Sequence, residues 1–170
     1  MNDSLKLVTE GLLKAMKAEH DGHYFYLSAA KNTEDPQGKS VFEMLADEER
    51  EHMEFLRAQY ASYMETGHAD TTVSLRMKKQ LTGESPIFSS AIKKNIKQAH
   101  YEMSALSIGI MLEQNSVSFY EAQARAVDDA EARDLYTQLA DWERGHLHAL
   151  IQQENALKVD YWREAGFEPF

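Results

Sequence analysis

The stretch LADEEREHMEFL, residues 45–56, recurs in the second half of the chain as LADWERGHLHAL, residues 139–150. The two copies share Leu, Ala, Asp, Glu, Arg, His and the final Leu, and they lie 94 residues apart (139 − 45 = 94). The same offset relates EHDGHYFY, which begins at Glu19, to EQNSVSFY, which begins at Glu113 (113 − 19 = 94). One register therefore relates the two halves of the chain, which indicates a duplicated structural unit.

Four of the pairs that the repeat keeps are candidates for chemistry, while several of their neighbours change. They carry carboxylate, imidazole or phenol groups: Glu19 with Glu113, Tyr26 with Tyr120, Glu49 with Glu143, and His52 with His146. Adjacent positions differ, as where Glu48 in the first copy corresponds to Trp142 in the second. A solvated acidic face gives no reason to keep one glutamate and vary the next. We therefore interpret the shared residues as fixed by their position in the fold.

The composition is that of an all-α protein. Only three prolines occur in 170 residues, and the segments between them are rich in residues that favour helices, such as Ala, Leu, Glu and Lys. Asp35 followed by Pro36 is typical of a helix start. The sequence predicts four long helices, over residues 4–32, 36–67, 98–127 and 131–157, which together form a four-helix bundle. By its length the whole chain, residues 1–170, is a single domain, with a short aromatic C-terminal segment packed back onto it.

About thirty residues connect the second and third predicted helices. Two antiparallel neighbours would need only a few residues, whereas a crossover that runs back along the bundle must cover roughly 50 Å, which this segment can reach. We therefore expect two helical hairpins joined by a long crossover. The crossover is locally basic, and its basic residues are Arg76, Lys78, Lys79, Lys93, Lys94 and Lys97. This basic surface either docks an acidic redox partner or a neighbouring subunit, or it is simply solvated.

Helix periodicity places the repeated glutamates on apolar faces. Glu49 and Glu143 each have a leucine four residues before, a histidine three residues after and another leucine seven residues after, all on one face of a helix. Glu19 and Glu113 lie on similar apolar stripes. The remaining acidic residues of the opening stretch are expected on the polar side of their helix: Asp47, Glu48, Glu51 and Glu54.

The two hairpins also bring these residues to one level. Antiparallel helices joined by a tight turn meet at residues equidistant from that turn. Residues 19 and 49 have their midpoint at 34, and residues 113 and 143 have theirs at 128, and both midpoints fall in predicted turns. Each hairpin therefore sets a lone glutamate beside a Glu-x-x-His pair.

Four carboxylates inside an apolar bundle are very costly without a counter-charge, and no lysine or arginine shares their stripes. Two divalent cations carry the charge of +4 that balances four carboxylates with two neutral imidazoles. A glutamate from each of two helices and Glu-x-x-His from each of the other two is the di-iron or di-manganese carboxylate pattern. The alternative is a repeat kept for packing alone, with its glutamates protonated or partly exposed to water.

These motifs, which cover both hairpins, resemble the rubrerythrin family of the ferritin-like superfamily. The resemblance rests on Glu19 followed by Tyr26, EREH at 49–52, Glu113 followed by Tyr120, and ERGH at 143–146. It implies a ferritin-like bundle that binds two iron ions, although manganese and zinc also accept such ligands.

The same resemblance implies a role for each residue. Glu49 and Glu143 would bridge the two metals. Each metal would have two further ligands: Glu19 and His52 on one, Glu113 and His146 on the other. Tyr26 and Tyr120 would donate hydrogen bonds to the carboxylates, although a tyrosine on a helix stripe is also a common core residue. His23, one turn beyond Glu19, is a further candidate ligand.

The resemblance also implies an activity, namely reduction of hydrogen peroxide or oxidation of ferrous iron, with peroxide, dioxygen or ferrous iron as substrate. Two departures qualify it. The chain has no cysteine, so it lacks the rubredoxin module of typical rubrerythrins and needs an external electron donor. Ser116 stands where rubrerythrins tend to have a further acidic residue. A metal-storage module with little turnover, a manganese catalase-like enzyme and a substrate-oxygenating enzyme remain alternatives.

Charge and hydropathy exclude other classes. A formal net charge of −10 argues against a nucleic-acid partner. The longest apolar run, residues 105–112, is far shorter than the roughly 20 residues that span a membrane. The first residues carry no signal-peptide pattern, so we expect a cytoplasmic protein with no membrane partner. We expect a homodimer or larger homo-oligomer, with Met103, Met111 and the small residues of the third helix at the contact, although a methionine stripe is also common in a core.

Overall fold

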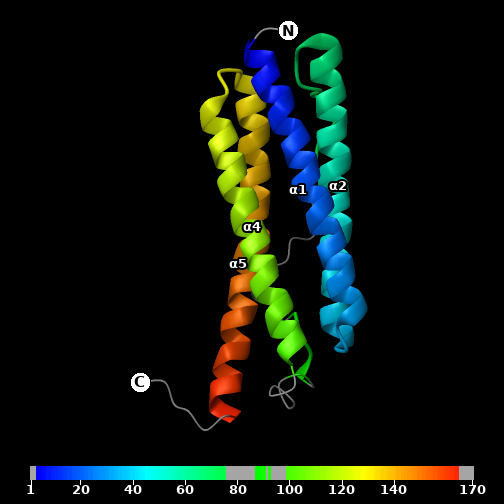
Figure 1. Ribbon diagram of the computed structural model, residues 1–170, viewed down its shortest axis with the longest axis vertical. Helices are drawn as coiled ribbons and strands as arrows, with labels where there is room; N and C mark the ends of the chain where they lie inside the picture. Colours follow the sequence, from blue (N-terminus) through cyan, green and yellow to red (C-terminus); the bar gives the residue numbers. More distant parts are fainter. Residues whose placement is uncertain (1–2, 76–86, 91, 93–98, 165–170) are drawn as a thin grey trace.

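The computed structural model describes residues 3–75, 87–90, 92 and 99–164. Four long helices dominate this part of the chain: α1 (Asp3–Asn32), α2 (Pro36–Thr66), α4 (His100–Ala126) and α5 (Ala130–Glu164). Helix α1 pairs with α2 and α4 pairs with α5, and the two hairpins lie side by side with α1 packed against α4 (Figure 1). The predicted all-α, ferritin-like four-helix bundle is confirmed.

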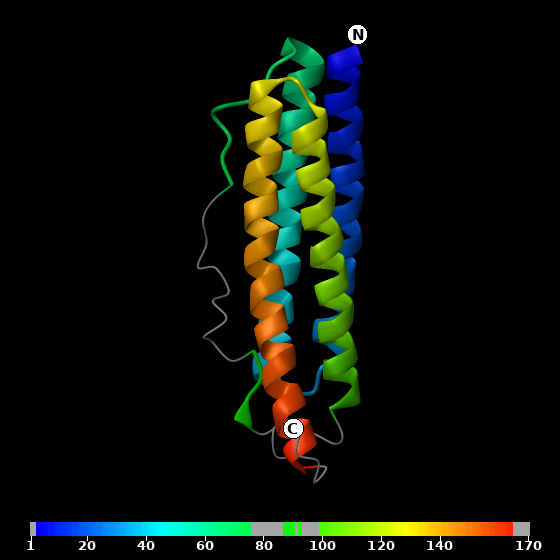
Figure 2. The same ribbon diagram turned by 90° about the vertical axis from the view of Figure 1, so that its left-hand side faces the viewer.

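The direction of the helices is also as predicted. Helix α2 ends at one end of the bundle and α4 begins at the other, so both run the same way along the long axis (Figure 2). Three predicted helices agree with the observed ones to within two residues, but α5 ends at Glu164, seven residues later than expected (164 − 157 = 7). The reason is that Tyr161 packs against the core and extends the helix. The basic residues predicted in the crossover, Arg76 to Lys97, lie outside the described residues.

Equivalent aspartates begin the second helix of each hairpin. Asp35 accepts a hydrogen bond from the backbone N–H of Gly38 at 2.9 Å, and Asp129 accepts one from Ala132 at 2.7 Å. These aspartates are themselves 94 residues apart (129 − 35 = 94), so the repeat includes the helix caps. Each cap makes a further contact, Asp35 with both the backbone N–H and the hydroxyl of Ser89 and Asp129 with the hydroxyl of Tyr63.

Two apolar clusters fill the bundle. The first contains Tyr26 and Phe42, whose stacked rings lie 6.3 Å apart, and the second contains Tyr120 and Tyr136, whose rings are stacked at the same distance. These two ring pairs are equivalent in the repeat, because Tyr120 and Tyr136 lie 94 residues after Tyr26 and Phe42 (120 − 26 = 94 and 136 − 42 = 94). In the described part of the chain, no helix carries an apolar stretch long enough to cross a membrane.

Replacing Asp35 with Ala should lower the free energy of unfolding by about 1–3 kcal/mol, because Gly38 and Ser89 lose their shared acceptor. Chemical denaturation measures this directly. The exposed Asp47 of the same helix provides the control, and Asp47→Ala should change stability by less than about 0.5 kcal/mol. Equal effects of the two substitutions would show that the Asp35 contacts do not hold the turn.

Candidate metal centre

The six residues predicted as ligands meet in the middle of the bundle. All are at least 96% buried, Glu49 being 4% exposed and Glu143 0%. Their ligand atoms form two groups, each with its atoms within 4.8 Å of one another: Glu19, Glu49, His52 and Glu143 in the first, and Glu49, Glu113, Glu143 and His146 in the second. Glu49 and Glu143 belong to both groups, so both are placed to bridge two ions.

Both imidazoles turn the same nitrogen towards the carboxylates. The Nδ1 atom of His52 lies 3.0 Å from one oxygen of Glu143, and the Nδ1 atom of His146 lies 3.3 Å from the other. The two rings are nearly parallel, at 18°, with centroids 6.0 Å apart. Glu143 is thus the centre of an approximately two-fold arrangement.

The two tyrosines tie the hairpins together at this level. The hydroxyl of Tyr26 on α1 donates to Glu113 on α4, and the hydroxyl of Tyr120 on α4 donates to Glu19 on α1. Both tyrosines are fully buried. The predicted contacts with the carboxylates are therefore present, while a catalytic role for either tyrosine stays a prediction.

A glycine makes room for one shared carboxylate. A Cβ atom at Gly22 of α1 would stand 3.3 Å from Oε2 of Glu49 and 3.4 Å from its Cδ. Any larger side chain would press on this carboxylate, so Gly22 lets Glu49 of α2 lie close to the backbone of α1.

The pKa values of the buried glutamates show that their negative charges need a counter-charge. Burial raises the pKa of Glu49 and of Glu113 well above the usual range, and the charge of Glu143 raises both further. Burial would also raise the pKa of Glu143, but the imidazoles of His52 and His146 outweigh it and hold that pKa well below the usual value.

For the two histidines, burial lowers the pKa, but the nearby carboxylates raise it by more. Burial alone would lower the pKa of His52, but Glu143 and Glu19 raise it to about 10. The pKa of His146 is also raised well above its ordinary value, against the effect of burial, by the nearby carboxylate of Glu143, by the hydrogen bond with Glu48 and by the charge of Glu113. Protons therefore neutralise the cluster when no cation does.

Several buried polar atoms at the cluster have no hydrogen-bond partner among the described residues. They are Oε1 of Glu49, both carboxylate oxygens of Glu143 and Nδ1 of His146. Unpartnered polar atoms are costly inside a protein, and carboxylate oxygens with imidazole nitrogens are the donor set that iron and manganese accept. The residues present fit a pair of divalent metals.

Glu48 corrects one prediction. It was expected on the polar side of its helix, but it is 2% exposed and accepts a hydrogen bond from Nε2 of His146 at 2.8 Å. Helix α2 faces both α1 and α5, so its buried surface is wider than one stripe. The signal was present in the sequence, because Glu48 lies four residues before His52 and seven before the buried Phe55. Asp47 and Glu54 are exposed, as predicted, and both contact Arg50.

His23 does not join the cluster. Its Nδ1 lies 2.6 Å from the backbone oxygen of Ala46, to which it donates, and the residue belongs to neither ligand group. This contact fixes α1 against α2 one turn away from Glu19. The geometry gives no support to the prediction of His23 as a further ligand.

Two hairpins around a duplicated carboxylate–histidine cluster define a ferritin-like bundle whose buried residues could hold metal ions. The rubrerythrin family profile matches residues 10–154, so the chain belongs to the rubrerythrin family. A solved structure titled "Hypothetical Protein Pfu-1136390-001" from Pyrococcus furiosus is similar over 89% of this chain and 90% of its own, with 26% identity and a TM-score of 0.58. A comparison with curated proteins finds no match.

The metal-free protein should lose stability as the pH rises from about 6 to about 9. The folded-state pKa of His52 is about 10, and those of Glu49, Glu113 and His146 are raised well above their ordinary values, so in this range the folded state binds more protons than the unfolded chain and is favoured at lower pH. Glu143 is ionised in both states throughout. Thermal unfolding of chelator-treated protein measures the slope.

Two controls accompany this measurement. Glu49→Gln should flatten the slope, because an amide has no proton to lose. A divalent metal should raise the unfolding temperature more at the higher pH, because its ligands must release protons. A metal-free profile that is level over this range would contradict the burial of these charges.

Proposed function

We propose that this chain binds two iron ions and is an oxidoreductase that reduces hydrogen peroxide or oxidises ferrous iron, with an external electron donor. The observation that carries the proposal is the pair of four-residue ligand groups that share Glu49 and Glu143. Membership of the rubrerythrin family supports it, because the resemblance implies these two activities.

The two four-residue groups indicate which residues would bind each ion. Glu19 and His52 would hold one ion, Glu113 and His146 the other, and Glu49 and Glu143 both. Four carboxylates and two neutral imidazoles match the charge of two divalent ions. A bound pair of irons would supply a redox couple that exchanges two electrons.

The chain's own residues would orient the ligands and keep water out. Tyr26 and Tyr120 each hold one oxygen of a terminal glutamate, which leaves the other oxygen facing the metal position. Burial, together with nearby Glu113 for Tyr26 and nearby Glu19 for Tyr120, raises the pKa of both phenols, so both keep their protons as donors. The apolar clusters above and below limit solvent.

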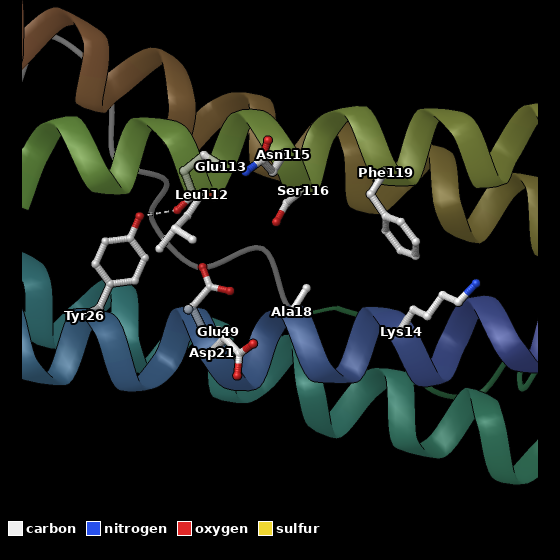
Figure 3. Close-up of a pocket in the computed structure, with 11 residues that line it drawn as sticks. Lys14, Ala18, Asp21, Tyr26, Glu49, Leu112, Glu113, Asn115, Ser116 and Phe119 are labelled. Atoms are coloured by element: carbon white, nitrogen blue, oxygen red, sulfur yellow. Dashed lines mark hydrogen bonds between the residues drawn. The ribbon is translucent and has the colours of Figure 1, made fainter.

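A pocket between α1 and α4 gives small molecules a route to the cluster. Its volume is about 370 Å³, and it reaches Glu49, Glu113 and Tyr26 (Figure 3). Ser116 and Phe119 line its α4 side, and Lys14 and Ala18 line its α1 side (Figure 3). The pocket is large enough for peroxide or dioxygen, and Ser116 leaves open the space that a longer acidic side chain would fill.

The proposed reaction needs electrons from elsewhere. Reduction of one hydrogen peroxide to two waters consumes two protons and two electrons. These 170 residues contain no cysteine to carry a second redox centre of the rubredoxin type, so the electrons would come from a donor outside them. When ferrous iron is the substrate, it supplies the electrons itself and becomes ferric.

Anaerobic loading of the metal-free protein with ferrous iron should give two irons per chain, and the loaded protein should consume peroxide when a reductant is supplied. Glu49→Ala and Glu143→Ala should each lower the iron content below two, and the double variant should bind none. Elemental analysis and a peroxide electrode measure both quantities. Two irons retained in the double variant would refute the site, whereas many irons per chain without turnover would favour storage.

Ser116→Leu should slow peroxide consumption about tenfold or more without lowering the iron content, because the larger side chain fills the pocket in front of Glu113. The matched control is Ser118→Leu on the exposed side of the same helix, where the serine hydroxyl donates to the backbone oxygen of Gln114. Equal rates for Ser116→Leu and the unmodified protein would show that substrate enters by another route.

A further inference from the structure

The two halves of the metal centre differ at one pair of equivalent positions. The repeat relates Glu48 to Trp142 (142 − 48 = 94), and each of these side chains lies against the histidine of the other hairpin. Both are buried, at 2% and 8% exposure. The six ligand residues are duplicated, but their surroundings are not.

On one side a carboxylate holds the histidine. His146 turns Nδ1 towards the cluster and Nε2 towards Glu48, whose Oε2 lies 2.8 Å away. A proton on Nε2 donates to Glu48, which leaves Nδ1 with its lone pair directed at the metal position. The hydrogen bond therefore fixes both the tautomer and the direction of this ring.

On the other side an aromatic ring takes the place of the carboxylate. His52 also turns Nδ1 inwards, but its ring meets Trp142 edge to face, with centroids 5.5 Å apart and an angle of 85°. Its Nε2 has no hydrogen-bond partner within the part of the chain that the structure describes. On its outer side this ring is therefore held by packing against Trp142, without the hydrogen bond to Nε2 that His146 has among the described residues.

A carboxylate that accepts the outer N–H of a ligand histidine makes the imidazole a better donor, and loss of such a partner typically weakens metal binding about 10- to 100-fold. We propose that Glu48 is a positioning residue for His146 and makes the two metal positions unequal, so that the position at His146 and Glu113 fills before the position at His52 and Glu19. This inference rests on the proposed two-metal function.

Anaerobic titration of the metal-free protein with cobalt(II), followed by calorimetry and visible absorption, tests the inference. The unmodified protein should bind two ions in steps that differ at least about tenfold in affinity. His146→Ala should remove the tighter step and His52→Ala the weaker one. This pair of variants assigns each step to its histidine.

Variants of Glu48 then test its role. Glu48→Gln keeps the volume and an acceptor oxygen but loses the charge, and Glu48→Leu loses both. The tighter step should weaken about 10- to 100-fold in Glu48→Leu and by less in Glu48→Gln, while the weaker step stays unchanged. Glu54→Gln removes the same charge from an exposed position of α2 and should change neither step.

The outcomes separate the two proposals. Two ions bound with equal affinity, or a tighter step that Glu48→Leu leaves unaltered, would overturn the inference while the two-metal centre stands. A weakening confined to the His52 step would overturn it as well. Failure to bind two ions at all would overturn the proposed function and the inference with it.

Discussion

The burial of four carboxylates in one apolar bundle is the constraint on which the rest of this structure depends. Glu19, Glu49, Glu113 and Glu143 are nearly inaccessible to water, and in the described structure only two imidazoles stand beside them as possible cations. Inside a protein such charges are tolerated only when protons or metal ions neutralise them. The raised pKa of Glu49 and of Glu113 and the unpartnered oxygens of Glu143 are two consequences of this single fact.

The two hairpins place the four carboxylates with the same set of contacts, which is used twice. Each hairpin sets a lone glutamate level with a Glu-x-x-His pair, and each tyrosine crosses to the other hairpin to hold its lone glutamate. Equivalent aspartate caps, Asp35 and Asp129, begin the second helix of each hairpin and so fix the register of the pairs. The two tyrosine contacts that join the hairpins at this level therefore also orient the proposed ligands.

Most of the fold and of the candidate cluster could be predicted from the sequence because the repeat supplied an internal comparison. Glu49 was separated from its acidic neighbours only because Glu143 occupies the same place. The same method failed at Glu48, where the copies differ and where helix α2 buries a surface wider than one stripe. The pocket beside Gly22 and Ser116 depends on the spacing of the two hairpins, which periodicity along one helix does not determine.

Anomalous diffraction at the iron edge, from crystals of protein purified without air and loaded with ferrous iron, tests the central claim most directly. The account predicts two peaks about 3.5–4 Å apart, each beside one histidine, with Glu49 and Glu143 in contact with both. A map without peaks at this level of the bundle, with the four carboxylates still buried and neutralised by protons alone, would contradict it.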